Sequence, residues 1–202
     1  MDLSQKKDFI NVTLIGALVG LLAQPILANA VADVTPIIRI GVFLGFLVLA
    51  PFALFITSLL GKFVSAVLYQ FGKFAAVGVL NTFVDLGVFN LCTFFYGAVP
   101  SGTFFSLFKG LSFVGATTNS FFWNKYWTFH SGEAPQPGQV TKFYVVAVGG
   151  LVINVIVATL VFKSGGVDPS PFWTNILSPM VGVASAFLWD FLGYKFLVFK
   201  KG

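Results

Sequence analysis

The 202-residue chain is too apolar to be a soluble protein. Hydrophobic residues make up 57% of it and charged residues only 9%, whereas soluble domains carry about 25% charged residues. Such a chain cannot cover its own surface in water, which excludes a disordered protein, a disulfide scaffold and an ordinary soluble enzyme. The composition therefore predicts an integral membrane protein, in which the formal net charge of +5 reflects loop residues and not nucleic-acid binding.

Six apolar segments are long enough to cross a bilayer, because a hydrocarbon core about 30 Å thick requires about 20 helical residues. They cover residues 9–30, 37–60, 74–96, 104–127, 143–162 and 172–196. The fold class expected is all-α, a polytopic membrane protein with six transmembrane helices. The first segment also resembles a secretory signal, since two lysines precede it and Ala28-Asn29-Ala30 ends it. Its apolar run is long enough to span, so we expect it to be a retained helix.

The distribution of basic residues predicts the orientation in the membrane. Nine of the 12 Lys and Arg residues fall on the side that holds both termini, and Arg39, Lys109 and Lys163 fall on the other. By the positive-inside rule, both termini then lie in the cytoplasm and the protein is multi-pass in the cytoplasmic (plasma) membrane. An aromatic belt at the cytoplasmic interface is expected at Trp123, Tyr126, Trp127 and Tyr194.

The second part of the chain contains an internal repeat. Residues 73–85 align with 142–154 at an offset of 69, and residues 124–129 align with 194–199 at an offset of 70. Each unit, 73–129 and 142–199, holds two spans, so the two hairpins form a parallel repeat. This divides the chain into an N-terminal transmembrane hairpin, 1–71, and a four-helix domain, 72–202.

The N-terminal hairpin carries a G-x-x-x-G pattern in each of its spans. These are Gly16 to Gly20 and Gly41 to Gly45. Glycines four residues apart allow two helix backbones to approach closely. The faces are expected either to pack the hairpin against itself and the core, or to dock a second copy or another partner.

The two repeat hairpins open and close with shared motifs. The first opens with Lys73-Phe74, continues to Gly78 and Asn81-Thr82, and closes with Asn124-Lys125-Tyr126-Trp127-Thr128-Phe129. The second opens with Lys142-Phe143 and closes with Lys195-Phe196-Leu197-Val198-Phe199. Over about residues 72–200 this pattern resembles the GtrA-like family of small polytopic membrane proteins. Tyr194 stands where the family's second Asn is expected, and Ala147 stands where its second Gly is expected.

The resemblance implies a role with polyprenyl-phosphate sugars. Such proteins are thought to move a polyprenyl-phosphate-linked monosaccharide from the cytoplasmic to the outer leaflet, for decoration of surface polysaccharide or protein. The implied partners are that lipid-linked sugar, membrane lipids, and a polyprenyl-phosphate glycosyltransferase that makes it; a homo-oligomer is a further possibility. No motif for catalysis, metal binding or phosphate cradling occurs, so we expect no enzyme activity, no catalytic residue, no metal and no cofactor.

Polar residues inside the spans are the candidate sugar site. Asp85 lies twelve residues after Lys73, or roughly 18 Å into the membrane, where an acid costs about 2.5–3.5 kcal/mol. It should therefore face the bundle interior or a wet cavity, and the repeat makes Asn154 its counterpart. The predicted groove consists of Asn81, Asp85, Asn119, Asn124, Asn154 and the shallower Asp190. The alternative for these residues is hydrogen bonding that only joins the helices.

Four lysines begin or end the repeat spans at the cytoplasmic interface. They are Lys73, Lys125, Lys142 and Lys195. A cluster of ammonium groups there suits a lipid phosphate, although lysines at this interface also follow from the positive-inside rule alone. Three functions remain open: translocation of the lipid-linked sugar, a non-transporting accessory role beside a glycosyltransferase, and proton-coupled export of a small molecule with Asp85 as the coupling acid.

Overall fold

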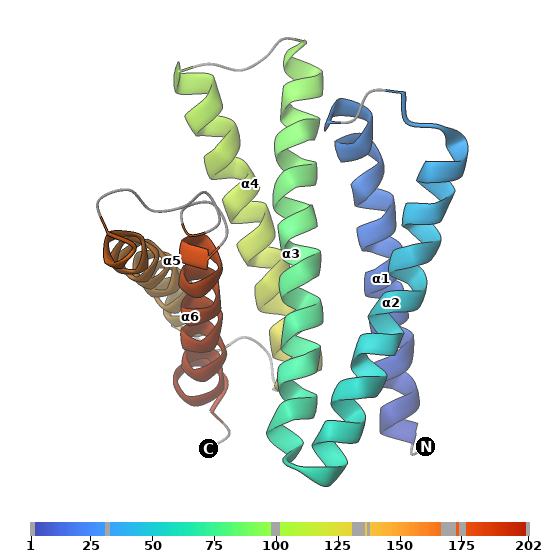
Figure 1. Ribbon diagram of the computed structural model, residues 1–202. Coiled ribbons are helices and arrows are strands. Elements are labelled where there is room, and N and C mark those ends of the chain that lie inside the picture. Colours follow the sequence, from blue (N-terminus) through green and yellow to red (C-terminus); the bar gives the residue numbers. More distant parts are fainter. Residues whose placement is uncertain are drawn as a thin grey trace. The chain divides into compact units, whose positions relative to one another are not determined.

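The computed structural model is all-α, which confirms the predicted fold class of a polytopic membrane protein (Figure 1). It describes residues 3–30, 33–97, 102–130, 136, 138–166, 173 and 177–200. The α-helices are α1 Leu3–Ala30, α2 Pro36–Phe63, α3 Ala66–Tyr96, α4 Gly102–Trp123, α5 Gln139–Ser164 and α6 Ser178–Gly193. Two π-helical segments, η1 Asn124–Thr128 and η3 Tyr194–Val198, extend α4 and α6.

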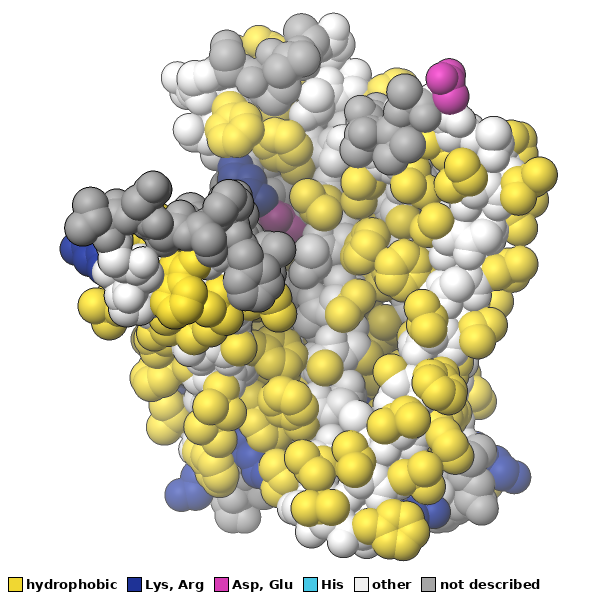
Figure 2. Space-filling view, viewed as in Figure 1, with side chains coloured by type: hydrophobic (Ala, Val, Ile, Leu, Met, Phe, Trp, Pro, Cys, Tyr) yellow, Lys and Arg dark blue, Asp and Glu magenta, His cyan; other side chains and the backbone are white. Residues whose placement is uncertain are grey.

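Five helical segments within the described part of the chain are long and apolar enough to cross a membrane. They are Leu3–Ala28, α2, α3, α5 and Ser178–Val198. The fourth predicted span falls outside this group because α4 carries Lys109 and a series of hydroxyl and amide side chains. Hydrophobic side chains cover most of the face seen in Figure 2, and charged ones are few. The first residues of the sixth predicted span, 172 and 174–176, lie outside the described residues.

The chain divides into two compact units. The first, Met1–His130, holds α1 to α4 with η1, and the second, Ser131–Gly202, holds α5, α6 and η3. The division at residue 71, which follows the sequence repeat, stays a prediction, while the compact units separate after residue 130. The reason is that α3 packs against α1 and α2 as well as against α4, so the N-terminal hairpin and the first repeat hairpin share one core.

The helices of the first unit run alternately up and down, with short turns at defined stop signals (Figure 1). Thr35 caps α2 through a hydrogen bond from Ile38 N to its Oγ1 at 3.4 Å, directly before Pro36. Gly97 ends α3 in the left-handed conformation, with φ 74°. We call the end with the start of α1, the α2–α3 turn and η1 the near end, and the opposite end the far end.

The first G-x-x-x-G pattern packs the N-terminal hairpin against itself. A Cβ at Gly16 would lie 2.5 Å from the carbonyl oxygen of Phe46, and one at Gly20 would lie 2.9 Å from the Phe43 ring. The α1 and α2 backbones are therefore too close for any larger residue. At Gly41 and Gly45, an added Cβ would meet nothing within 4 Å among the described residues. The second pattern faces away from its own hairpin.

The two repeat hairpins close in the same way. In each, the π-helical segment ends with a five-residue hydrogen bond, from Phe129 N to Asn124 O at 2.9 Å and from Phe199 N to Tyr194 O at 2.8 Å. The opening phenylalanine of each hairpin packs on its closing one, with ring centroids 6.4 Å apart in the first unit and 6.0 Å apart in the second.

A glutamine four residues before each opening phenylalanine completes this closure. Gln70 donates to the carbonyl of Thr128 at 3.3 Å, and Gln139 donates to that of Val198 at 3.1 Å. These positions are related by the offsets of 69 and 70 that define the repeat in the sequence. Each hairpin is therefore the same supersecondary unit, and the same backbone and side-chain contacts join its opening and closing residues.

Candidate functional site

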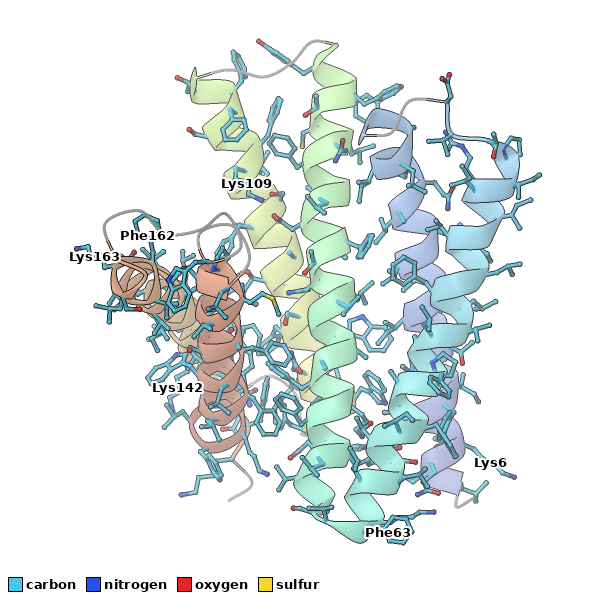
Figure 3. The ribbon with its side chains drawn as sticks, viewed as in Figure 1. Lys6, Phe63, Lys109, Lys142, Phe162 and Lys163 are labelled. Atoms are coloured by element: carbon cyan, nitrogen blue, oxygen red, sulfur yellow. The ribbon has the colours of Figure 1, made fainter. Side chains whose placement is uncertain are left out.

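Five polar side chains join α3 to α4 in the first unit. Asn119 Nδ2 donates to Asn81 Oδ1 at 3.0 Å. Further toward the far end, Lys109 Nζ lies 2.5 Å from Asp85 Oδ2, and the hydroxyl of Ser112 donates to Asp85 Oδ1 at 2.5 Å. We call these residues, Asn81, Asp85, Lys109, Ser112 and Asn119, the polar seam. Lys109 extends from α4 toward α3 in Figure 3.

The positions of the seam residues follow from antiparallel helix geometry. Asn81 and Asp85 are four residues apart, so they lie on the same face of α3. On α4, Ser112 and Asn119 are seven residues apart, or two turns. Because the α3–α4 connection falls between residues 96 and 102, residues about equally distant from it lie at the same height. The seam therefore has two successive levels. At one, the amides of Asn81 and Asn119 pair; at the next, the Asp85 carboxylate pairs with Lys109 and Ser112.

The ion pair of the seam is partly open to its surroundings. The Lys109 side chain is 50% exposed and that of Asp85 27% exposed, whereas Ser112 is buried. Charged side chains at membrane depth face the protein interior or a water-filled cavity, because contact with hydrocarbon costs several kcal/mol. Contact with a molecule that offers polar groups therefore suits this face of α3 and α4 better than contact with lipid acyl chains.

Asn124 continues the polar side chains of α4 to the near end. It is fully buried in η1, and its amide nitrogen donates to Ser120 Oγ at 3.1 Å. Its Oδ1 and the hydroxyl of Thr128 have no hydrogen-bond partner among the described residues. From Asn124 to Lys109 the distance along the helix is roughly 22 Å at 1.5 Å per residue. Polar groups therefore recur along the α4 side of the hairpin over most of a bilayer core.

A second charged cluster lies at the near end and centres on Asp8 of α1. The carboxylate accepts from the Tyr69 hydroxyl at 2.8 Å and the Trp127 indole at 2.8 Å, and it pairs with Lys73 at 3.3 Å. Asp8 is 4% exposed and Lys73 is 3% exposed. We call these four residues the Asp8 cluster. It ties the N-terminal hairpin to the opening lysine and to the closing tryptophan of the first repeat hairpin.

The four lysines predicted to bind a lipid phosphate lie in different environments. The ammonium of Lys73 already has the Asp8 carboxylate as its partner, and Lys125 is only 1% exposed, with its Nζ 5.8 Å from the Tyr126 ring centroid. Lys195 is half-buried, with its Nζ 5.6 Å from the Phe191 and Phe196 rings. Lys142 is exposed on α5 (Figure 3). Their joint role in phosphate binding stays a prediction.

The predicted site residues of the second unit lie on the facing sides of α5 and α6. A Cβ at Gly182 would lie 2.5 Å from Asn154 Oδ1, and one at Gly150 would meet the Asp190 carboxylate. Asp190 Oδ1 is buried and has no hydrogen-bond partner among the described residues. Both side chains therefore occupy close α5–α6 contacts opened by glycines. The pairing of Asn154 with Asp85 across the two repeats stays a prediction.

Sequence reasoning missed Asp8, Lys109 and Ser112. Lys109 entered the sequence analysis only as a basic residue of the outer side. Its distance along the chain from the α3–α4 connection is close to that of Asp85, and this could have indicated that the two lie side by side. Asp8 lies between Lys7 and Phe9 and gave no sign of its partners, which are 61 to 119 residues away. Trp127 and Tyr194, expected in an interfacial belt, are buried in the protein instead.

The helices and the seam define an integral, multi-pass α-helical membrane protein with polar groups built into a transmembrane hairpin. No cluster of three or more metal-ligating His, Cys, Asp or Glu side chains is found in the described part of the chain. The family of the GtrA/DPMS transmembrane domain matches residues 73–199, and the chain belongs to this family. Its members are generally non-catalytic membrane proteins, and the family ties this protein to the metabolism of sugars on glycosyl-carrier lipids.

Comparison with individual proteins adds a bacterial relative. The chain is 25% identical over 129 residues to the uncharacterized membrane protein YngA of Bacillus subtilis (strain 168), covering 63% of this chain and 78% of that protein. No solved structure shows a significant match. The family match begins at residue 73, so α1, α2 and the first turns of α3 precede it.

Proposed function

We propose that this protein moves a polyprenyl-phosphate-linked monosaccharide across the cytoplasmic membrane, with both termini in the cytoplasm. The observation that carries the proposal is the half-exposed Asp85–Lys109 pair in the polar seam. Two charges on a transmembrane hairpin are stable only beside other polar groups, and a sugar with its phosphate supplies such groups. Unpaired sugar hydroxyls in hydrocarbon would each cost several kcal/mol, which the seam avoids by offering amide, hydroxyl and charged partners.

In this mechanism the lipid tail stays in the bilayer while the headgroup moves along the seam. The sugar first replaces the hydrogen bond from Asn119 to Asn81 and then the one from Ser112 to Asp85. Lys109, on the far side of Asp85, exchanges its carboxylate partner for the arriving phosphate. Lysine suits this step because it binds phosphate as a point charge without fixed geometry.

The test is leaflet exchange of a labelled polyprenyl-phosphate hexose in liposomes. Asp85→Asn, Lys109→Met and the double variant are compared with the wild type, and Asp33→Asn, at an exposed turn residue, is the matched control. Replacing both partners of an ion pair by uncharged residues changes stability little, whereas replacing only one partner destabilises the protein. We therefore expect the double variant to fold like the wild type yet exchange lipid at least about tenfold more slowly, a barrier change of about 1.4 kcal/mol. Wild-type exchange by the double variant would reduce the seam to a structural contact.

A second candidate function is a non-transporting partner of a polyprenyl-phosphate glycosyltransferase. It is favoured by the open G-x-x-x-G face of α2, where a Cβ added at Gly41 or Gly45 would meet nothing within 4 Å among the described residues, because such faces commonly pack against another transmembrane helix. Here Gly41→Leu should abolish co-purification with the transferase, while the folded wild type shows no lipid exchange. Proton-coupled export has no comparable support, since Asp85 is held by Lys109 and Ser112.

A further inference from the structure

An open pocket of about 290 Å³ lies at the near end of the first unit, and none of its lining residues belongs to the polar seam. Asn11 of α1 lines one part of it, and four aromatic residues from the end of α4 and from η1 line the rest: Phe122, Trp123, Tyr126 and Trp127. Ligand pockets in proteins begin at about 300 Å³. The pocket therefore fits a ligand no larger than a single sugar ring or a small headgroup.

The aromatic wall of the pocket is held in place by contacts within the unit. Trp127 is buried and its indole nitrogen is bonded to Asp8, while its ring meets that of Trp123 edge-on, with centroids 5.7 Å apart and planes at 77°. Phe122 and Tyr126 lie parallel, with centroids 6.3 Å apart and planes at 9°, and both are 49% exposed. The Trp127 indole is therefore fixed in place, while the rings of Phe122 and Tyr126 stay accessible.

Three polar groups of the pocket have hydrogen-bonding capacity to spare. The Asn11 amide, the Trp123 indole N–H and the Tyr126 hydroxyl make no hydrogen bond to the described residues. Aromatic rings that also carry a donor, such as those of Trp and Tyr, bind ligands that are apolar on one side and polar on the other. A pyranose ring has this character, because its C–H faces stack on aromatic rings and its rim carries hydroxyls.

The pocket also lies next to the first bond of the polar seam. Asn119, which donates to Asn81 at 3.0 Å, precedes Phe122 and Trp123 by three and four residues, so one helical turn separates them on the same side of α4. We propose that this pocket binds the pyranose ring of the lipid-linked sugar before the sugar enters the seam. The inference rests on the proposed function and adds a role for α1, whose Asn11 lies outside the family match.

The test uses soluble short-chain probes with the full-length protein in nanodiscs. The probes are farnesyl phosphate and farnesyl phosphate linked to glucose, mannose, galactose or N-acetylglucosamine, and binding is measured by isothermal titration calorimetry. We expect at least one sugar-bearing probe to bind about tenfold or more tightly than farnesyl phosphate. Asn11→Ala and Trp123→Phe should each reduce that sugar-dependent gain by up to about tenfold, which corresponds to one hydrogen bond, and should leave the affinity for farnesyl phosphate unchanged.

The control is Trp189→Phe, the same chemical change at a tryptophan of α6 in the second unit, which should alter neither affinity. Equal binding of all probes, or a sugar-dependent gain that survives both pocket variants, overturns the inference in favour of an ordinary interfacial aromatic patch. Lipid exchange without any sugar-dependent gain in affinity would refute sugar binding at this pocket but would leave the proposed function intact. Sugar-selective binding at the pocket without any lipid exchange would refute translocation and keep the pocket.

Discussion

Neutralising Asp8 should destabilise the first unit more than any other single charge change at the near end. Its carboxylate is buried with three donors: the Tyr69 hydroxyl and the Trp127 indole at 2.8 Å each, and the Lys73 ammonium at 3.3 Å. Asp8→Asn leaves the Lys73 ammonium buried without a counter-charge. Breaking a buried ion pair in this way costs about 3–5 kcal/mol, against at most about 1 kcal/mol for an exposed pair.

The assay is reversible SDS-induced unfolding in mixed micelles, followed by tryptophan fluorescence. It is applied to Asp8→Asn, Lys73→Met and the double variant, with the exposed Asp33→Asn expected within about 0.5 kcal/mol of the wild type. The two single changes should be non-additive by about 1–3 kcal/mol, because each removes the same interaction. Additive effects, or a loss below about 1 kcal/mol for Asp8→Asn, would refute the view that this cluster joins the N-terminal hairpin to the family domain.

Three further predictions, two on packing and one on a hydrogen bond, can be measured by the same unfolding assay. Gly16→Leu should destabilise the protein by at least about 1–3 kcal/mol through overpacking, while Gly41→Leu should have little effect; similar losses for both would contradict the close α1–α2 approach. Phe74→Ala and Phe143→Ala should each cost about 3–5 kcal/mol, because both rings are buried at equivalent positions, and a clearly unequal pair would argue against equivalent closure of the two repeats. Ser112→Ala should cost about 1 kcal/mol, and no loss would show that its bond to the seam carboxylate adds nothing to stability.

Hydropathy and repeat offsets predicted most of the fold because both are properties of the local sequence. The length of each apolar run determines whether it spans, and the shared Lys-Phe and Lys-x-x-x-Phe motifs located two hairpins whose ends have the same π-helical closure. Asp85 was identified as an intramembrane acid for the same reason, since one charge within an apolar run is conspicuous. The structure adds Lys109 and Ser112 as its partners.

Contacts between the N-terminal hairpin and the family domain could not be read from the sequence. Asp8 resembles an ordinary charge at the start of a span, and only the packing of α1 on α3 brings it to Lys73. The pairing of Lys73 with the Asp8 carboxylate was not predicted either, and binding of a lipid phosphate by Lys73 stays a prediction. The role of the polar groups of α4 was not predicted either, because only the packing of α4 on α3 brings Ser112 to Asp85 and Asn119 to Asn81.

The most direct measurement of the central claim is leaflet exchange by the wild-type protein itself. Purified protein in liposomes would be given a labelled polyprenyl-phosphate hexose, with protein-free liposomes and labelled phosphatidylglycerol as controls. The account predicts exchange of the lipid-linked sugar well above both controls, lowered in the folded double variant Asp85→Asn, Lys109→Met. Exchange by the folded wild type no faster than in protein-free liposomes would contradict translocation and leave the accessory role beside a glycosyltransferase as the better account.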